Sequence, residues 1–394
     1  MPASPIRRLA GLAAETRGRG IRIHSLNIGQ PDIPAPAVML ARLSEYAENN
    51  VAYGPSDGLP DLIDAICAYH GKCGHDVERK DVFVTTGGSE ALLFTFAAVC
   101  DDGDDVVVFE PFYTNYSGFG GLVGVKTSPV TTRTEDGYHL PAREVIAAAV
   151  GPRTRAVVLC SPNNPTGTVY TDDEIDRVAS ICKERGLFLI ADEVYREFVY
   201  GDRAHRSVLM LGDMRDRVVV VDSLSKRVSM CGARVGWIVT KSRPLLDAVL
   251  RMGQARLCPP TLGQFMGAAL DRVPDGYIRD VVDEYRLRRD VVFDALSGMD
   301  GVTVRRPEGA FYVCAKLPID DAQRFAEFLL RDFAVDGETV MVAPADGFYA
   351  TPGLGTREVR IAYVLDRERL GRAMRIVERA LGAYGGRPAD PCWR

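Results

Sequence analysis

The sequence predicts an α/β protein with a three-layer large domain around a seven-stranded, mostly parallel sheet, plus a smaller α+β domain. Seven short β-branched runs are almost continuously apolar, which is typical of strands buried on both faces of a sheet. Helical patterns separate these runs, as in a doubly wound sheet. The expected strands are Asp81–Thr85, Asp105–Phe109, Gly124–Pro129, Ala156–Leu159, Leu187–Ala191, Val218–Val221 and Gly236–Val239.

The helical patterns and a change in the order of elements define two expected domains. A capping-box sequence, Thr-Asp-Asp-Glu, opens the helix expected at Thr171–Arg185. After a helical stretch at about Pro274–Met299 the pattern changes to short strands and two helices, and the first forty or so residues are expected to pack against this part. We therefore predict a large domain at 45–285 and a small domain made of 1–44 and 286–394. The further helices expected are Ser89–Val99, Arg143–Val150, Asp321–Asp332 and Arg367–Ala383, and the further strands are Val302–Val304, Ala310–Cys314, Val340–Val342 and Val359–Tyr363.

Composition excludes several classes of function. The 394 residues carry 48 Lys and Arg against 53 Asp and Glu, a net charge of −5, and no basic stripe that would bind nucleic acid. No apolar run reaches about 18 residues, so no membrane span is expected. The opening MPASPIRRLA has basic residues without an apolar segment, so no secretory signal is expected. Nine scattered cysteines fit reduced thiols, and we expect a cytoplasmic protein.

The residues that follow the expected strands carry the candidate chemistry, since ligands of open α/β sheets bind beyond the carboxyl ends of the strands. GGSEA, at 87–91, opens a helix and is a candidate phosphate cradle, although a tight turn capped by Ser89 explains it equally. Tyr113 could stack on a planar ligand or belong to a buried aromatic cluster. In SPNNPTG, at 161–167, Asn164 could bind a ligand oxygen or form an Asx turn.

Two further strand ends carry charged residues. Asp192 ends a buried strand, where it could bind a metal, act as a base or pair with a cationic heterocycle, and Tyr195 follows one helical turn later. Lys226 lies in a serine-rich turn after another strand, which favours Schiff-base chemistry. Ser223 and Arg234 nearby suit a phosphate, whereas the alternative is a surface Lys-Arg pair.

Taken together, GGSEA, SPNNPTG, ADEVY and SLSKRVSMCGARVG, in this order, resemble the class I/II aminotransferases. These are pyridoxal-phosphate enzymes of fold type I, the aspartate aminotransferase fold. The resemblance covers nearly the whole chain, from LNIGQPD at 26–32 to VRIAY at 359–363. It implies pyridoxal 5′-phosphate as cofactor and a homodimer with shared active sites.

The resemblance also implies roles for single residues at the cofactor. Lys226 matches the lysine that forms a Schiff base with the cofactor, and Asp192 matches the carboxylate that pairs with its ring nitrogen. Tyr195 and Asn164 match donors to the phenolate oxygen, and Tyr113 matches an aromatic stacked on the ring. The residues that match phosphate-binding positions are Gly88, Ser89, Glu90, Ser223 and Arg234, together with Tyr53, which would reach the phosphate of the partner subunit.

Substrate binding follows from the same resemblance. Arg360 matches the arginine that grips the α-carboxylate, supported by Asn164, and Gly29 lies in a segment expected to close over the substrate. Lys226, once released, would act as general base. The expected reaction is ping-pong transfer of an amino group between an α-amino acid, with aspartate favoured, and a 2-oxo acid. The alternatives are a lyase or decarboxylase that uses the same cofactor, and a non-catalytic regulatory module.

Three features depart from the commonest family pattern and leave the substrate open. Ala233 replaces an aromatic before Arg234, and the stretch 343–354 is long enough for a lid or specificity loop. Arg256 could meet a distal carboxylate or be a surface charge. The cluster CAYHGKCGH, at 67–75, has metal-binding residue types, but its spacing matches no standard zinc site, so we expect no metal.

Overall fold

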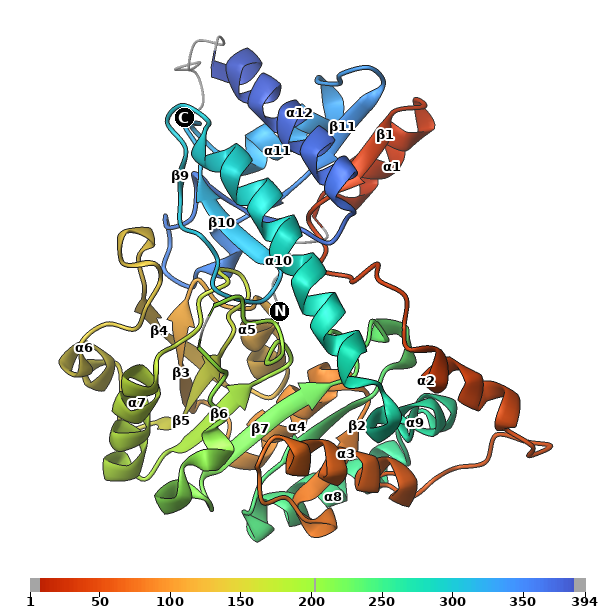
Figure 1. Cartoon of the computed structure of the whole chain (residues 1–394). Helices are drawn as coiled ribbons and strands as arrows, with labels where there is room; N and C mark the ends of the chain where they lie inside the picture. Colours follow the sequence, from red (N-terminus) through yellow and green to blue (C-terminus); the bar gives the residue numbers. More distant parts are fainter. Residues whose placement is uncertain (1–7, 202, 386–394) are drawn as a thin grey trace.

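The large sheet has the predicted seven strands, in the order β2-β8-β7-β6-β5-β3-β4 (Figure 1). The computed structural model describes residues 8–201 and 203–385. All neighbours in the sheet are parallel except β8, which runs antiparallel to both β2 and β7. The predicted fold class is therefore confirmed. The strands are β2 (Val82–Thr85), β3 (Asp105–Glu110), β4 (Lys126–Thr131), β5 (Thr154–Cys160), β6 (Phe188–Asp192), β7 (Val218–Ser223) and β8 (Gly236–Val239).

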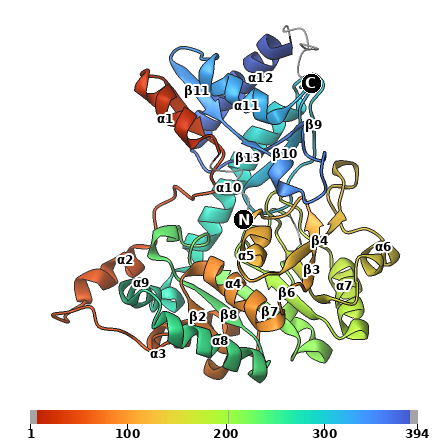
Figure 2. The same ribbon diagram turned by 180° about the vertical axis from the view of Figure 1, so that it is seen from behind.

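Helices cover both faces of this sheet and give it three layers (Figures 1 and 2). Alternate residues of one strand enter two separate cores: Val106 and Val108 belong to one, and Val107 and Phe109 belong to the other. Burial on both faces explains why the strands read as continuous apolar runs. The first core is closed by α4 (Gly87–Val99), α5 (Asn115–Leu122) and α8 (Arg243–Arg256), and the second by α3 (Pro60–Lys72), α6 (Arg143–Ala148) and α7 (Asp172–Arg185).

The helix α7 begins and ends as its sequence predicts. The Thr171 hydroxyl accepts a hydrogen bond from the backbone N–H of Glu174, and the Glu174 carboxylate accepts one from the backbone N–H of Thr171. Gly186 then ends the helix in the left-handed conformation, at φ 67°.

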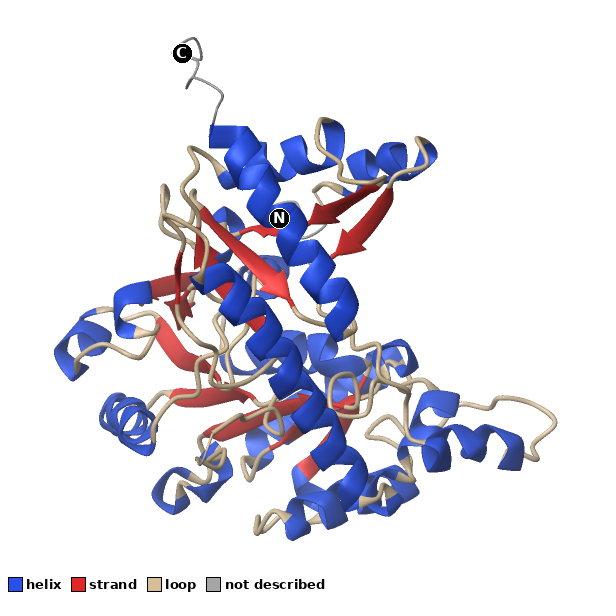
Figure 3. Ribbon diagram, turned by 45° about the horizontal axis from the view of Figure 1, so that its top comes forward, coloured by secondary structure: helices blue, strands red, loops and turns tan. Residues whose placement is uncertain are grey.

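A smaller lobe lies above the large sheet in Figure 1 and contains a four-stranded sheet, β12-β13-β10-β9. The N-terminal strand β1 (Arg22–Ser25) pairs parallel with β11 (Glu338–Met341), so the start of the chain packs against its C-terminal part (Figure 1). Figure 3 shows the helices and strands of both lobes by type. The other elements of this lobe are α1 (Ala10–Gly18), β9 (Thr303–Val304), β10 (Tyr312–Lys316), α11 (Ala322–Arg331), β12 (Ala343–Pro344), β13 (Glu358–Ala362) and α12 (Arg367–Gly385).

One long helix and one projecting arm complete the molecule. The helix α10 (Asp275–Ser297) runs from the large sheet to the small lobe and passes through the domain boundary predicted at residue 285, which stays a prediction (Figure 1). The outer parts of the predicted small domain, 1–7 and 386–394, lie outside the described residues. The arm carries α2 (Ala37–Ala41), which contacts α9 (Thr261–Gly267), and a loop with exposed apolar side chains. No helix in the described part of the chain is long and apolar enough to cross a membrane.

Candidate active site

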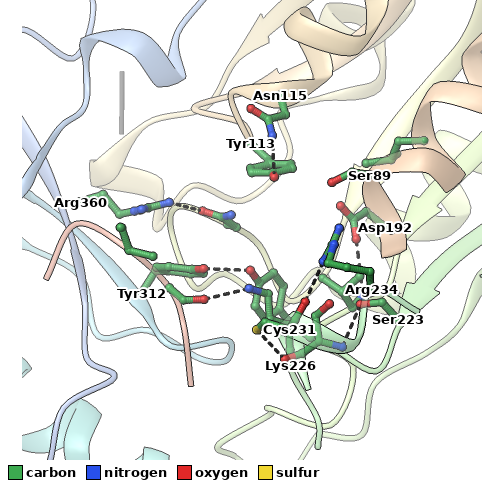
Figure 4. Close-up of a pocket in the computed structure, with 18 residues that line it drawn as sticks. Ser89, Tyr113, Asn115, Asp192, Ser223, Lys226, Cys231, Arg234, Tyr312 and Arg360 are labelled. Atoms are coloured by element: carbon green, nitrogen blue, oxygen red, sulfur yellow. Dashed lines mark hydrogen bonds between the residues drawn. The ribbon is translucent and has the colours of Figure 1, made fainter. Parts of the chain in front are cut away.

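A cavity of about 540 Å³ lies at the carboxyl edge of the large sheet, beneath the small lobe (Figure 4). This is where open α/β sheets bind their ligands. Of the thirteen predicted site residues, eleven line the cavity, although they come from segments spread over more than 300 residues of sequence. They are Gly29, Gly88, Ser89, Tyr113, Asn164, Asp192, Tyr195, Ser223, Lys226, Arg234 and Arg360.

Asp192 is the buried acid of the cavity. It is the last residue of β6 and only 4% exposed, and its Oδ2 accepts a hydrogen bond of 2.9 Å from the Tyr116 hydroxyl. Burial raises the pKa of the Asp192 carboxyl to about 6, and the nearby charge of Lys226 opposes this increase only in part. A buried carboxylate without a close cation is costly, so this position favours a ligand that brings a positive charge.

Lys226 lies in the turn after β7 and faces the same cavity. Its Nζ donates a hydrogen bond of 2.8 Å to the Gly29 carbonyl and lies 5.9 Å from the centre of the Phe311 ring. Among the described residues no carboxylate lies within ion-pair distance of this amine. The amine is therefore held by one backbone carbonyl, which a bound ligand can replace.

The wall of the cavity formed by Arg234 and the start of α4 is suited to bind an anion. The backbone N–H groups at the start of α4 face Arg234, a residue in the left-handed conformation with φ 55°. The Arg234 guanidinium donates to the Cys231 carbonyl at 2.9 Å. Glycine is required at two places here: a Cβ on Gly87 would lie 2.5 Å from Arg234 Nη2, and one on Gly236 would lie 2.4 Å from the Gly87 carbonyl carbon. The glycines thus let the guanidinium and the helix N-terminus approach one point.

Arg360, in β13, supplies a second anion site on the opposite wall. It is 2% exposed, and its Nη1 donates to Asn164 Oδ1 at 3.1 Å while Nη2 donates to the Asn27 carbonyl. Its guanidinium lies between two rings, 4.6 Å from the centre of Tyr312 and 4.9 Å from that of Phe348. No carboxylate of the described residues pairs with it. A buried, uncompensated guanidinium with its fork open to a cavity is suited to bind a carboxylate.

Two predicted residues do not line the cavity. The Glu90 carboxylate turns back to accept one hydrogen bond from the Thr86 backbone N–H at 2.7 Å, and it pairs with Arg256 Nε at 3.3 Å. Arg256 also donates to the backbone carbonyls of Ser56 and Val84 and does not line the cavity. Tyr53 lies on the projecting arm and is 79% exposed. Its contact with a partner subunit's phosphate stays a prediction.

The stretch 343–354 is fastened to the site. The fully buried carboxylate of Glu110 accepts hydrogen bonds from the backbone N–H groups of Ala350 and Thr351, at 2.8 and 3.0 Å. The Phe112 backbone N–H also donates to the Phe348 carbonyl at 2.9 Å. In this conformation the stretch forms a wall behind Arg360.

Several cavity residues were not predicted. Tyr312 comes from β10, where the sequence shows only a strand, and its hydroxyl lies 2.9 Å from the Tyr195 hydroxyl. Asn115 donates to the Tyr113 hydroxyl at 2.8 Å and could have been suspected from its place two residues after Tyr113. The remaining ones are Ile28, Leu92, Val194, Ser225 and Cys231.

Behind the cavity lies a buried ionic cluster formed by chain neighbours of the cavity residues. Arg227 is 1% exposed and pairs with Asp222 and, at 3.0 Å, with Glu197, so it is not the surface charge considered as an alternative. Glu193 accepts hydrogen bonds from Ser207 Oγ at 2.8 Å and from the Val208 backbone N–H at 3.0 Å. Interactions with the neighbouring His205, Arg196 and Ser207 outweigh burial and lower the pKa of Glu193 to about 2.

Comparisons with known proteins agree with this geometry. The family described as Aminotransferase class I and II matches residues 22–377. A probable aspartate/prephenate aminotransferase of Aquifex aeolicus is 32% identical over 391 residues, covering 96% of each chain. The structure of an aspartate aminotransferase from Thermus thermophilus with maleate has a TM-score of 0.86 at 29% identity, covering 96% of this chain and 97% of that one. An alanine aminotransferase from Pyrococcus furiosus has a TM-score of 0.88 at 30% identity, covering 97% and 98%. The chain therefore belongs to the class I and II aminotransferases and is an enzyme of fold type I that transfers amino groups.

Proposed function

We propose that this aminotransferase binds pyridoxal 5′-phosphate in the described cavity and moves an amino group from an α-amino acid to a 2-oxo acid by a ping-pong mechanism. The observation that carries the proposal is the meeting of three charged groups in one cavity. These are the unpaired amine of Lys226, the buried carboxylate of Asp192 and the uncompensated guanidinium of Arg360. The amine fits the aldehyde of the cofactor, the Asp192 carboxylate fits its cationic ring nitrogen, and the Arg360 guanidinium fits the carboxylate of the substrate.

The cavity walls fit the other parts of the cofactor. Arg234, Ser223 and the α4 N-terminus with Gly88 and Ser89 would hold the phosphate. Tyr113 would cover a face of the ring, and Tyr195 and Asn164 would donate to its phenolate oxygen. When bound, pyridoxal phosphate supplies an electron sink for the electron pair left on the substrate Cα.

The chain's own residues would then bind the substrate and move the proton. Arg360 and Asn164 would hold the α-carboxylate and so fix the direction of the Cα–H bond. Lys226 Nζ would take the proton from the substrate Cα and deliver it to the cofactor carbon that is bonded to the transferred nitrogen. Gly29, whose carbonyl accepts from Lys226, would lie in the segment that closes over the site.

Aspartate is the donor that we favour, since proteins named aspartate or aspartate/prephenate aminotransferase recur among the relatives. The cations that line the cavity in the described part of the chain are Lys226, Arg234 and Arg360, and each already has a role. The side-chain carboxylate of aspartate must therefore be bound by a residue other than these three.

We propose a cytoplasmic homodimer with shared sites, in which Tyr53 reaches the partner's phosphate, and domains at 45–285 and at 1–44 with 286–394.

Incubation of the cofactor-loaded enzyme with single amino acids, without any 2-oxo acid, tests the proposal. We expect one equivalent of pyridoxamine phosphate and one equivalent of the 2-oxo acid per site, formed together, with the fastest conversion for aspartate. The visible absorbance of the cofactor reports this half-reaction directly. Continuous release of pyruvate and ammonia, or of carbon dioxide, from the donor alone would instead identify the lyase or decarboxylase alternative.

A further inference from the structure

Tyr312 contacts three parts of the active site. It is the first residue of β10, only 2% exposed, and reaches down from the small lobe into the cavity (Figure 4). Its hydroxyl meets the Tyr195 hydroxyl, its ring lies beneath the Arg360 guanidinium, and its hydroxyl occupies the space beside Gly29.

In the contact between the Tyr312 and Tyr195 hydroxyls, the number of available hydrogens decides which hydroxyl is the donor. The two hydroxyl oxygens are 2.9 Å apart, and in the structure either could be the donor. Burial holds the pKa of Tyr195 well above its ordinary value, so Tyr195 keeps its single hydrogen. If Tyr195 donates that hydrogen to the cofactor's phenolate oxygen, only Tyr312 can donate in the contact between the two tyrosines. A donor behind Tyr195 polarises its O–H bond and makes it a better donor in turn.

The second contact concerns substrate binding. The Arg360 carbon Cζ lies 4.6 Å from the centre of the Tyr312 ring, with Phe348 on the other side at 4.9 Å. A guanidinium between two aromatic faces is fixed in one plane, so less freedom is lost when it binds a carboxylate.

The third contact explains a glycine in the N-terminal segment. A Cβ on Gly29 would lie 1.8 Å from the Tyr312 hydroxyl oxygen, so this close approach requires glycine. The Gly29 carbonyl, in turn, accepts the hydrogen bond from Lys226. The position of Tyr312 thus also limits where the carbonyl that holds the catalytic amine can lie.

We propose that Tyr312 is a further functional residue of this active site: its hydroxyl orients and strengthens Tyr195 as a donor to the cofactor, and its ring positions Arg360 for the substrate carboxylate. The inference rests on the proposed function. It makes Tyr312 a positioning residue with two separable roles, one of the hydroxyl and one of the ring.

Two variants separate these roles. Tyr312→Phe removes only the hydroxyl, whereas Tyr312→Leu also removes the aromatic face. Tyr363→Phe is the matched control, because Tyr363 is another buried tyrosine of the small lobe whose hydroxyl reaches backbone carbonyls at 3.4 and 3.5 Å and does not line the cavity.

The first measurement is a pH titration of the visible absorbance of the resting, cofactor-loaded enzyme. A donor to the phenolate oxygen favours the deprotonated form of the linkage between Lys226 and the cofactor, so a weakened donor raises the midpoint. We expect Tyr312→Phe to raise the midpoint by about 0.5 to 1 pH unit, the worth of one hydrogen bond, with Tyr363→Phe unchanged. An unshifted midpoint in Tyr312→Phe would overturn the role of the hydroxyl.

The second measurement is the dissociation constant of succinate, a dicarboxylate with no amino or keto group. We expect Tyr312→Leu to weaken succinate binding about fivefold, while Tyr312→Phe stays within about twofold of the parent, because the ring is retained. Equal binding by Tyr312→Leu and the parent would overturn the role of the ring. Failure of the proposed function shows separately, as a parent enzyme without any visible cofactor band.

Discussion

Asp192 and Glu193 are adjacent buried carboxylates whose pKa values are shifted in opposite directions. Substituting each in turn therefore tests how burial and neighbouring groups affect folding stability at this site. The pKa of Asp192 is raised from an ordinary 3.8 to about 6, mainly by burial. That of Glu193 is lowered from 4.5 to about 2, because its neighbours outweigh burial. A raised carboxyl pKa means that ionisation costs more in the folded chain than in the unfolded one, so the ionised group weakens folding, and a lowered pKa means the reverse.

The magnitude follows from the shifts. For Asp192 a shift of about two units corresponds to about 3 kcal/mol of lost folding stability, fully present above pH 6, roughly half present at pH 5 and gone below 3.8. We therefore expect Asp192→Asn to stabilise the cofactor-free protein by about 3 kcal/mol at pH 8, since the amide oxygen can still accept from Tyr116. Glu193→Gln should destabilise it by a similar amount at pH 8, and this loss should vanish as the pH falls from 4.5 toward 2.

Urea unfolding of the cofactor-free proteins at one protein concentration, at pH 8 and pH 5, measures both effects. The gain in Asp192→Asn should shrink toward pH 5, whereas the loss in Glu193→Gln should persist there. An Asp192→Asn protein that is less stable than the parent at pH 8 would refute the reasoning. So would two variants whose stabilities change with the same sign.

Three further predictions concern single cations. In Lys226→Ala, borohydride should no longer attach the cofactor covalently, as seen by intact mass, while the exposed Lys183→Ala should be labelled like the parent; full turnover without Lys226 would contradict the assignment. Arg360→Lys should lower kcat/KM about 10- to 100-fold through loss of the two-pronged carboxylate contact, with the cofactor band intact and the exposed Arg357→Lys unaffected. Arg227→Ala removes the cation that pairs with the fully buried Asp222 and the partly buried Glu197, and it should cost about 3–5 kcal/mol in urea unfolding; a loss below about 1 kcal/mol would contradict the buried cluster.

Local sequence signals predicted the large sheet well. Each of the seven expected strands has a counterpart in the sheet. Six of them are almost fully buried, and burial on both faces leaves a continuous apolar run in the sequence, whereas the edge strand β4 is only partly buried. The helix predicted at Thr171–Arg185 begins one residue later, at Asp172, with Thr171 as its N-cap, and the capping box was predictable because it lies within four residues of sequence. The predicted strand Val340–Val342 overlaps β11, but its parallel partner β1 was missed, because a four-residue strand paired across some 300 residues leaves no local pattern.

The site residues that the sequence predicted are also those that belong to local motifs. Residues in the motif loops, such as Asp192 and Lys226, lie together in the cavity because parallel strands end at the same edge. Glu90 belongs to such a motif, yet its side chain turns back to the backbone N–H of Thr86 at the start of its own helix, a choice of rotamer that the sequence does not record. Tyr312 belongs to no motif loop and reaches the cavity only through packing of the small lobe over the large sheet.

The chain neighbours of the cavity residues have a consequence for how such an enzyme changes. The side chains of Asp192, Ser223 and Lys226 line the cavity. Their neighbours in the chain point away from the cavity and form charge pairs on the reverse side: Glu193, Asp222 and Arg227. A substitution on that reverse side never meets a substrate, yet it displaces a backbone that carries a reacting group. Catalytic rates in this protein are therefore open to adjustment by mutations that an inspection of ligand contacts alone would pass over.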